Sequence, residues 1–353
     1  MSAGSEIASV ECLLGSGQDL YHLAWLHTGL MGLEKQGHIH LRFRSPSPAE
    51  RAYSDDGHTM LLVSRECRTR RIGIDLYDRN NRWEESLLTA SDVYFKRSYC
   101  LAEAAKRPEA ARIFPLGLNY AARCDFSPWR PARALGVRLV SNLLSGALPW
   151  RRALDRFRQF ADSPVASAFE RPPAVAADGI LFQPRLWEPE STDDNVEEVN
   201  GLRVGIVRLL AQEFGSRFSG GVLPTPYARS RYPDALSKAP SARPEYVRFS
   251  LRHAIGINTR GLHHSNPFKI GEYLAGSFCL LSDPMRNELP EPLRQGIEYD
   301  LYTTPEECAA HCERLLSNPG EIQERREASW RYYRDNVRAE ALWAKRLAEA
   351  LAI

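Results

Sequence analysis

The sequence predicts an α/β protein of two domains, each with its own largely parallel sheet. The chain has 353 residues, more than the ~150 that one domain usually holds. Short apolar runs alternate with amphipathic helical segments in both halves, as in a doubly wound sheet. A basic and aromatic stretch at 124–178 interrupts this alternation. We therefore expect an N-terminal domain at 1–165, which includes most of that stretch, and a C-terminal domain at 166–353.

In the first half, the expected elements begin with a short strand at Val10–Leu14 and a turn at Gly15–Gly17. An amphipathic helix is expected at 20–35, because leucines recur there at helical spacing on one face. Further strands, each ending at a polar residue or a Gly/Pro signal, are expected at 38–43, 58–64, 71–75, 92–95 and 112–116.

The second half repeats the alternation of strands and helices and becomes helical from Pro305 to Ile353. Its earlier elements are expected to be a strand at 179–182, a helix at 194–214, strands at 217–223 and 254–259, a helix at 266–275 and a strand at 277–283. Both halves therefore have the pattern of a Rossmann-like domain.

The composition excludes several classes of protein. Hydrophobic residues make up 43% and charged residues 25%, which is ordinary for a soluble globular chain. The net charge of +2 gives no whole-chain field that favours a nucleic-acid partner, so we expect none. No apolar run approaches the ~20 residues of a transmembrane helix, and Met1–Glu6 lacks the features of a secretory signal. We expect a cytoplasmic protein.

The helix expected at 266–275 has a start suited to binding an anion. Asn266 can serve as its N-cap, and Pro267 suits the first helical position because its fixed φ is already helical. The N–H groups of the first turn then point back toward the end of a strand, where they attract phosphate. Lys269 and Glu272 lie three residues apart, which places a cation for a diphosphate and a carboxylate for a ribose diol on one face.

Each residue that could contact a nucleotide also has a simpler interpretation. Lys269 and Glu272 could form an exposed ion pair worth about 0.2–0.5 kcal/mol. Arg185 directly follows an apolar strand, where ligands bind in open α/β sheets, but it could pair with nearby surface glutamates. His264 could donate to a phosphate or a sugar hydroxyl, or be a plain loop residue.

The second half resembles glycosyltransferases of the GT-B class, in particular the group-1-type families that use nucleotide-activated sugars. The resemblance covers roughly 178–320 and is carried by Leu181–Trp187, Pro267–Ala275 and Leu280–Asp283. It implies two Rossmann-like domains facing a cleft, with the donor held by the second. In such families the glutamate at the place of Glu272 binds the donor ribose, and a basic residue at the place of Arg185 meets the diphosphate.

Two further comparisons bear on the acceptor and on the stereochemistry. Asp92–Tyr99 and Arg112–Asn119 look like acceptor-domain segments of polysaccharide-associated glycosyltransferases. Retaining members of the class usually carry a glutamate eight residues before the ribose glutamate, whereas this chain has His264 there. The sequence therefore leaves open whether the anomeric centre is retained or inverted.

The reaction implied by the resemblance needs a stabilised leaving group. Breaking the bond from the anomeric carbon to the diphosphate develops negative charge, which fixed cations and helix N–H groups stabilise. Arg185, Arg260, Lys269 and the helix end at Asn266, with His264 as a hydrogen-bond donor, can supply this. We therefore expect no metal and no cofactor, with the nucleotide sugar as a co-substrate.

An inverting reaction would also need a general base on the acceptor side. Asp75, Asp19 and His27 of the first domain are candidates, and His264 is a further candidate for a catalytic role. Asp75 ends an apolar strand, so it could instead be a turn or cap residue.

The sequence thus predicts a metal-independent glycosyltransferase that moves a sugar from a nucleotide-activated donor to a saccharide or glycolipid acceptor. Two alternatives stay open. One is a nucleotide-sugar epimerase or phosphorylase on the same fold, since a fold does not fix a function. The other is a catalytically silent scaffold of a glycan-assembly complex, suggested by His264.

The basic and aromatic stretch adds one alternative about location. Val137–Leu148 has apolar residues on or near one helical face, and Trp150–Arg152 follows it. Such a segment could contact the inner membrane surface peripherally, or it could pack against its own domain.

Overall fold

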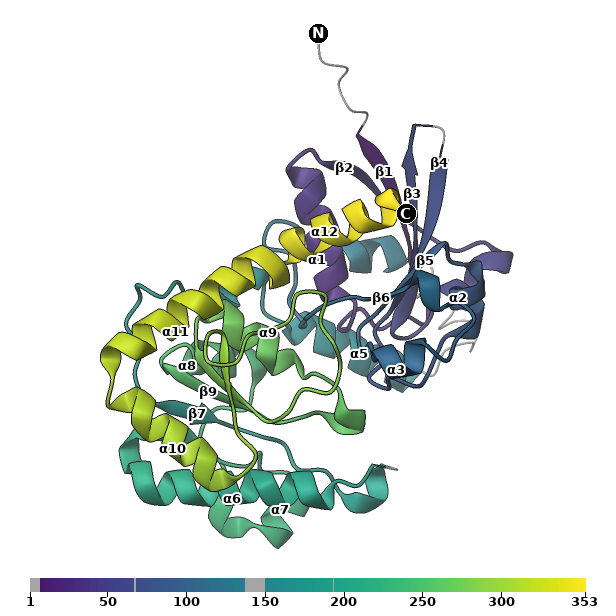
Figure 1. Cartoon of the computed structure of the whole chain (residues 1–353). Coiled ribbons are helices and arrows are strands. Elements are labelled where there is room, and N and C mark those ends of the chain that lie inside the picture. The colour runs from purple at the N-terminus through teal and green to yellow at the C-terminus, as the bar shows by residue number, and fades with distance from the viewer. Residues whose placement is uncertain (1–6, 67, 137–149, 193) are drawn as a thin grey trace. The chain divides into compact units, whose positions relative to one another are not determined.

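The computed structural model describes residues 7–66, 68–136, 150–192 and 194–353 (Figure 1). The chain divides into two compact units. Unit 1 comprises Met1–Ser167, Asn287–Glu291 and Asn336–Ile353, and unit 2 comprises Ala168–Arg286 and Pro292–Asp335. This division differs from the domain ranges that we expected, because the last helix of the chain belongs to unit 1.

Unit 1 contains a six-stranded sheet with the order β2-β1-β3-β4-β5-β6. The strand β3 is antiparallel to both of its neighbours, while β1 pairs with β2, β4 with β5 and β5 with β6 in parallel. The strands are β1 Ala8–Leu13, β2 Ile39–Arg44, β3 His58–Arg65, β4 Arg68–Asp75, β5 Val93–Lys96 and β6 Ile113–Pro115.

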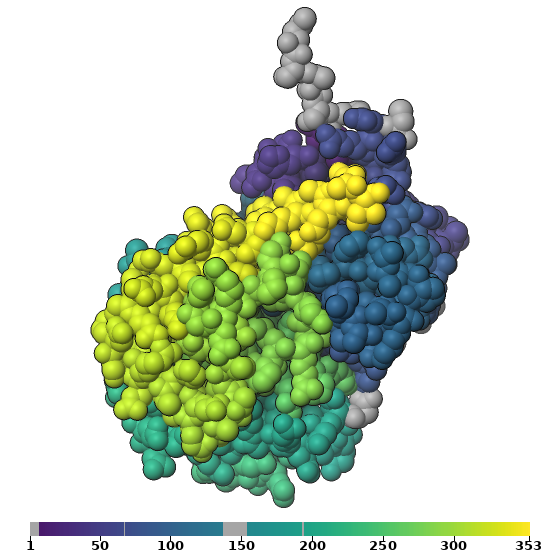
Figure 2. Space-filling view, in the orientation of Figure 1, coloured from purple at the N-terminus to yellow at the C-terminus, as the bar shows by residue number. Residues whose placement is uncertain are grey.

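The helices of unit 1 cover this sheet and include the C-terminal helix of the chain. Those whose bounds fall within the described residues include α1 Ala24–Lys35, α2 Glu85–Ala90, α3 Leu101–Ala104, α5 Trp150–Asp162 and α12 Ala339–Ala352. In the space-filling view, the yellow residues of α12 lie against purple residues of the N-terminal segment (Figure 2). Our interpretation of Val137–Leu148 as an amphipathic segment lies outside the described residues.

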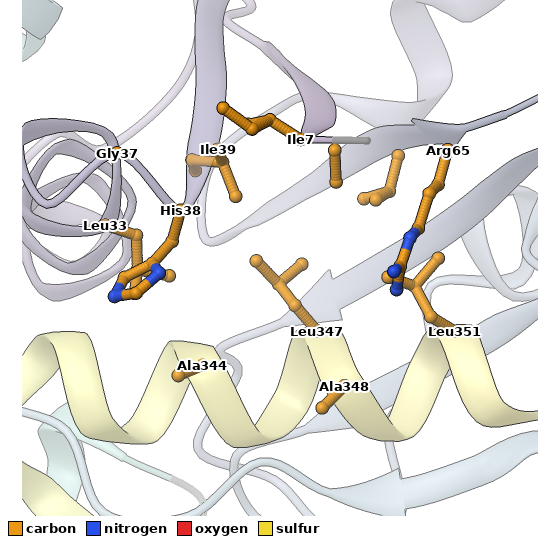
Figure 3. Close-up of a pocket in the computed structure, with 12 residues that line it drawn as sticks. Ile7, Leu33, Gly37, His38, Ile39, Arg65, Ala344, Leu347, Ala348 and Leu351 are labelled. Carbon is orange, nitrogen blue, oxygen red and sulfur yellow. The ribbon is translucent and has the colours of Figure 1, made fainter. Parts of the chain in front are cut away.

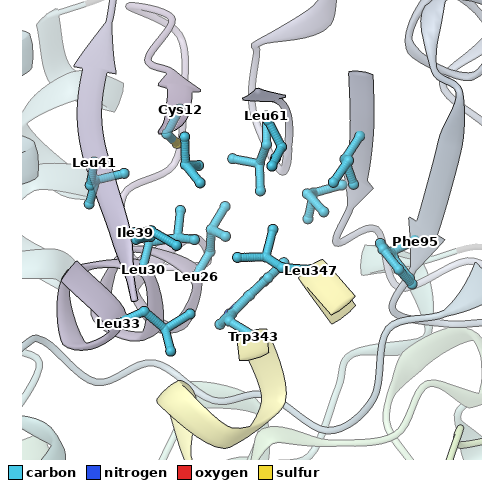
Figure 4. Packing of buried hydrophobic residues seen from close by; sticks show 14 of the residues in the cluster. Cys12, Leu26, Leu30, Leu33, Ile39, Leu41, Leu61, Phe95, Trp343 and Leu347 are labelled. Atoms are coloured by element: carbon cyan, nitrogen blue, oxygen red, sulfur yellow. The ribbon is translucent and has the colours of Figure 1, made fainter. Parts of the chain in front are cut away.

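The core of unit 1 joins two helices that lie far apart in the sequence. Leu30 of α1 and Trp343 and Leu347 of α12 are buried together against the sheet (Figure 4). The two helices approach closely at Gly29, where an added Cβ would lie 2.3 Å from the Trp343 ring. The C-terminal helix therefore completes the core of unit 1.

Unit 2 contains a five-stranded, all-parallel sheet with the order β11-β10-β9-β7-β8. Its strands are β7 Ile180–Phe182, β8 Phe218–Gly220, β9 Ile255–Asn258, β10 Cys279–Ser282 and β11 Tyr299–Leu301. Its α-helices are α6 Glu197–Phe214, α7 Pro226–Arg231, α8 Arg243–Ser250, α9 Phe268–Ala275, α10 Pro305–Leu316 and α11 Pro319–Tyr332. Because the strands are parallel, their carboxyl ends share one edge of the sheet, where ligands bind in such folds.

These elements confirm the predicted α/β class with two mainly parallel sheets. The main difference is the antiparallel strand β3, which forms a hairpin with β4. In the described ranges, no helix combines the length and the apolar character needed to cross a membrane.

Candidate functional site

The carboxyl ends of β7 and β9 are tied together by Arg203, a buried residue of α6. Its Nε donates to Thr259 Oγ1 at 2.7 Å, its Nη1 to Arg185 O at 2.6 Å and its Nη2 to Arg260 O at 2.7 Å. Its guanidinium lies 4.1 Å from the centre of the Trp187 ring. Burial lowers the pKa of Arg203 to about 10, so the side chain remains charged at neutral pH.

Sequence reasoning missed Arg203. The signal that could have revealed it is an arginine on the apolar face of α6, among Val199, Ile206 and Leu210, where a charged side chain needs buried partners. Its effect is to fix the backbone of two loops at the edge where we expected a ligand.

Arg185 and Arg260 therefore lie on neighbouring loops, as their proposed role requires. The side chain of Arg185 is exposed. Arg260 Nη2 lies 3.0 Å from Glu198 Oε2, in a pair whose carboxylate is 72% exposed. The Arg260 side chain is only 16% exposed, so its guanidinium is sheltered while the carboxylate that it contacts is open to solvent.

The helix α9 begins one residue later than we predicted. Pro267 is the N-cap, with φ −67° and ψ 153°, and Phe268 is the first helical residue. The prediction that Asn266 caps the helix is therefore wrong, although Asn266 is buried directly before it. Proline has no side-chain acceptor, so the N-cap side chain does not compete with an anion for the N–H groups of the first turn.

Lys269 and Glu272 contact separate partners and do not form the ion pair that we considered. Lys269 Nζ donates to Gln183 O at 2.5 Å, which places the first turn of α9 at the end of β7. Glu272, 7% exposed, accepts a hydrogen bond from Arg243 Nη1 at 3.2 Å and another from Nη2 of the same guanidinium. Sequence reasoning missed Arg243, which lies 29 positions earlier in the chain.

His264 lies in the loop that follows β9. Its φ of 59° and the φ of 54° at His263 are both left-handed, which is uncommon outside glycine. Asp194 holds this loop by accepting the backbone N–H of His263. Burial, and then the charges of Arg286 and Arg260, lower the pKa of His264. The neutral imidazole is suited to hydrogen bonding near neutral pH.

Asp75 has a structural environment in unit 1. Its side chain is completely buried, and its Oδ2 accepts hydrogen bonds from Tyr94 Oη at 2.6 Å and from Lys96 Nζ at 2.8 Å. Its Oδ1 accepts the backbone N–H of Tyr77 at 2.9 Å. A base must reach the hydroxyl that it deprotonates, so we do not carry Asp75 forward in that role.

Asp19 forms a turn before α1 and contacts a histidine that sequence reasoning did not single out. Its Oδ1 accepts the backbone N–H groups of Tyr21 at 2.9 Å and His22 at 3.3 Å. Its Oδ2 lies 2.9 Å from Nδ1 of His22. These local bonds explain why the helix predicted from residue 20 begins at Ala24.

His27 is part of the interior of unit 1. The residue is 2% exposed, and burial lowers its pKa to about 3. Neither ring nitrogen has a hydrogen-bond partner among the described residues. An imidazole enclosed in this way cannot contact the hydroxyl of an acceptor substrate, so we do not carry His27 forward as a general base.

A separate groove lies in unit 1 at the amino ends of β1 and β2, which is the sheet edge opposite to the carboxyl ends of these strands. Its volume is about 390 Å³, and α12 contributes Leu347 and Leu351 to its wall (Figure 3). Apart from His38 and Arg65 its lining is apolar, so it lacks the polar side chains that a nucleotide requires. Among the described residues, no group of three or more His, Cys, Asp and Glu side chains could hold a metal ion.

The fold is thus of the class with two α/β domains that carry mainly parallel, Rossmann-like sheets. Residues 207–352 match the model of a family described as "Glycosyl transferase-like". This match confirms, for those residues, the resemblance to glycosyltransferases that the sequence indicated. A comparison with curated proteins finds no match.

Several solved structures are similar to this chain at low identity. A glycosyltransferase from Rickettsia africae is 12% identical, with 94% of this chain and 80% of that chain covered and a TM-score of 0.42. HepE from Anabaena, crystallised with UDP and glucose, is 9% identical, with 96% and 98% covered and a TM-score of 0.45. The MnaA–UDP structure from S. aureus is 8% identical, with 96% and 94% covered and a TM-score of 0.42.

Proposed function

We propose that the protein is a glycosyltransferase that binds a nucleotide-activated sugar at the strand ends of unit 2. The observation that carries this proposal is the contact of Lys269 with Gln183 O, at 2.5 Å. It brings together a helix N-terminus, a lysine and the loop after β7, which Arg203 fixes to the loop after β9. Backbone N–H groups and cations at one point are the features that bind a diphosphate.

These groups would also promote the reaction. Negative charge grows on the diphosphate as its bond to the anomeric carbon breaks, and Lys269, Arg185 and Arg260 are placed on the elements that surround the α9 N-terminus. Fixed charges of this kind stabilise the transition state without reorganisation. We therefore propose that the transfer is independent of metal and uses no cofactor beyond the nucleotide sugar.

Glu272 is the group that we propose for the ribose. Its two oxygens are held by the Arg243 guanidinium, which orients the carboxylate and balances its charge. A carboxylate accepts several hydrogen bonds at once, so two ribose hydroxyls can be added to those from Arg243. Asn266 and His264, on the segment before α9, would then lie next to the phosphates or the sugar.

On the acceptor side, we propose that unit 1 receives a saccharide or glycolipid and that the protein acts in the cytoplasm in polysaccharide biosynthesis. A glycolipid acceptor would bring the protein to the inner membrane surface through peripheral contact.

The donor site can be tested by hydrogen exchange with UDP, GDP, ADP, CDP and dTDP in turn. We expect one of them to protect residues 179–187 and 254–283, because a ligand that binds the native state slows local opening. Lys269→Met should weaken binding of that nucleotide by about tenfold or more, the loss of one charge-assisted contact. Lys106→Met removes an exposed lysine of unit 1 and is the matched control.

A folded protein that shows no protection with any of the five nucleotides would refute the proposal. Analysis of the products then separates transfer from the alternatives, because an epimerase needs no acceptor, a phosphorylase needs free phosphate and a scaffold does not turn the donor over.

A further inference from the structure

The groove of unit 1 between α12 and the strand ends has an apolar floor that is continuous with the core. This floor consists of buried side chains of the core cluster, namely Leu33, Ile39, Val63 and Leu347. The rim is open to solvent: Ile7 is 44% exposed, and Ala344 and Ala348 are exposed and one turn apart on α12. Because an alanine side chain ends at Cβ, this part of the helix leaves room above the floor. Exposed apolar surface that continues into a core favours an apolar ligand.

The size of the groove limits what it can hold. Its volume of about 390 Å³ lies at the lower end of the range of about 300–1,000 Å³ for small-molecule pockets. A methylene group is about as large as a water molecule, which takes ~30 Å³ in the liquid, so this volume corresponds to one alkyl chain of roughly 13 carbons. A lipid with two acyl chains is too large for it.

Two basic side chains lie at the margins of the apolar lining. Figure 3 shows Arg65, at the end of β3, and His38, directly before β2, on opposite sides of Leu347. Both basic side chains are exposed. Among the described residues that line the groove, none carries a carboxylate. An apolar lining with basic groups at its margin complements an amphiphile whose head group is an anion.

A second arginine reinforces the positive charge at the end of β3. Arg65 and Arg68 are direct partners in the β3–β4 hairpin, so their side chains leave the sheet on the same face as Val63. Within the described part of the chain, neither guanidinium forms an ion pair, and Glu66 in the intervening turn is exposed. Like charges directly opposite each other destabilise a hairpin, and an anion bound between them removes this repulsion. The planar fork of arginine suits a carboxylate, which it binds through two parallel hydrogen bonds.

We propose that this groove binds a single-chain fatty acid, with the carboxylate on Arg65 and Arg68 and the alkyl chain along Val63, Ile39 and Leu347. The volume favours one alkyl chain over two, and the arginine pair favours an anionic head group over a neutral one. The proposal is independent of the proposed function, because all of these residues belong to unit 1 and none is part of the donor site. A bound chain contacts α12 and the strand ends at once, so it strengthens the packing of this helix on the sheet.

The test is calorimetric titration of the full chain with hexanoate, octanoate and decanoate, each below its critical micelle concentration. We expect saturable binding at a single site, with an affinity that rises by about fourfold for each added methylene that is buried. Octan-1-ol has the same chain as octanoate without the charge and should bind at least about tenfold more weakly, because it forms no charge-assisted hydrogen bond. In hydrogen exchange, decanoate should protect residues 33–39 and 344–351, which border the groove.

Two variants separate the head group from the chain. Arg65→Gln removes the charge from an exposed side chain, so it should weaken octanoate binding by about tenfold or more and change octan-1-ol binding by less than about twofold. Arg42→Gln alters an exposed arginine of β2 outside the groove and is the matched control. Ala348→Trp fills the groove from an exposed position of α12, so it should block octanoate and octan-1-ol alike while the fold is kept.

Three calorimetric results would each overturn the proposal: titrations that never saturate, equal affinities for octanoate and octan-1-ol, or normal octanoate binding by Arg65→Gln. A ligand-free dimer in sedimentation that Ala348→Trp dissociates would also overturn it, because a second copy of the chain would then occupy the groove. If phosphatidylglycerol vesicles bind the wild type but not Arg65→Gln, while octanoate binds neither, the partner is a lipid bilayer and the proposal fails.

Discussion

The buried imidazole of His27 should make unit 1 sensitive to mild acid, and His27→Leu should remove this sensitivity. Burial lowers the pKa of His27 from 6.5 to about 3. The unfolded chain therefore binds a proton on this residue before the folded chain does. Stability that is fully present above pH 6.5 is lost as the pH falls through the window between these two values.

The magnitude follows from the shift. At pH 5 the imidazole of an unfolded chain is almost fully protonated, about 1.5 pH units below its pKa, while that of the folded chain is neutral. At 1.36 kcal/mol per unit, the wild type should lose about 2 kcal/mol of stability between pH 7 and pH 5 through this residue. Leucine cannot titrate, and it also removes two polar atoms that have no partners in the described structure.

The assay is hydrogen exchange of the α1 amides at both pH values, corrected for the intrinsic pH dependence of exchange. This measures unit 1 directly, since unfolding of a two-unit chain is not expected to be a single transition. His40→Leu, an exposed histidine, is the control. An equal loss of opening free energy in wild type and His27→Leu would refute the reasoning.

Two further predictions concern unit 2. Arg203→Met should destabilise it by about 2–3 kcal/mol in thermal unfolding, because two carbonyls and a hydroxyl lose their buried donor; Arg208→Met, which breaks an exposed ion pair, should cost less than about 1 kcal/mol. Gly220→Ala should destabilise the β7–β8 pair, since φ is 137° and the new Cβ would lie 1.9 Å from the Phe182 carbonyl oxygen. Gly201→Ala, on an open face of α6, should instead stabilise unit 2 by about 0.5–1 kcal/mol and raise its melting temperature. A Gly201→Ala variant less stable than Gly220→Ala would contradict this account.

The sequence predicted most elements of the fold because their apolar periodicity is local. The starts of α1 and α9 were misplaced, also for local reasons. Asp19 bonds to the backbone two and three residues later and delays α1 to Ala24, and Pro267 takes an extended ψ and becomes a cap instead of the first helical residue. Such competition between side chain and backbone changes boundaries without changing the apolar pattern.

The candidate site was predictable only in part. Lys269 and Glu272 could be named from the motif, but their actual partners come from other segments. Gln183 is 86 positions from Lys269, and Arg243 is 29 positions from Glu272. Asp19 and His22 are only three positions apart, yet the sequence analysis singled out Asp19 alone, because the spacing does not reveal which imidazole the carboxylate contacts.

The place of α12 in unit 1 has a consequence for the order in which the chain can fold. Trp343 and Leu347 belong to the same buried cluster as Leu30 of α1, so this core stays incomplete until α12 has left the ribosome. Unit 2 is synthesised in between, and its own core can form first. The N-terminal half must therefore wait with its apolar sheet face exposed, which is the period when a nascent chain depends most on chaperones. A shortened chain that ends before Ala339 would never leave that state.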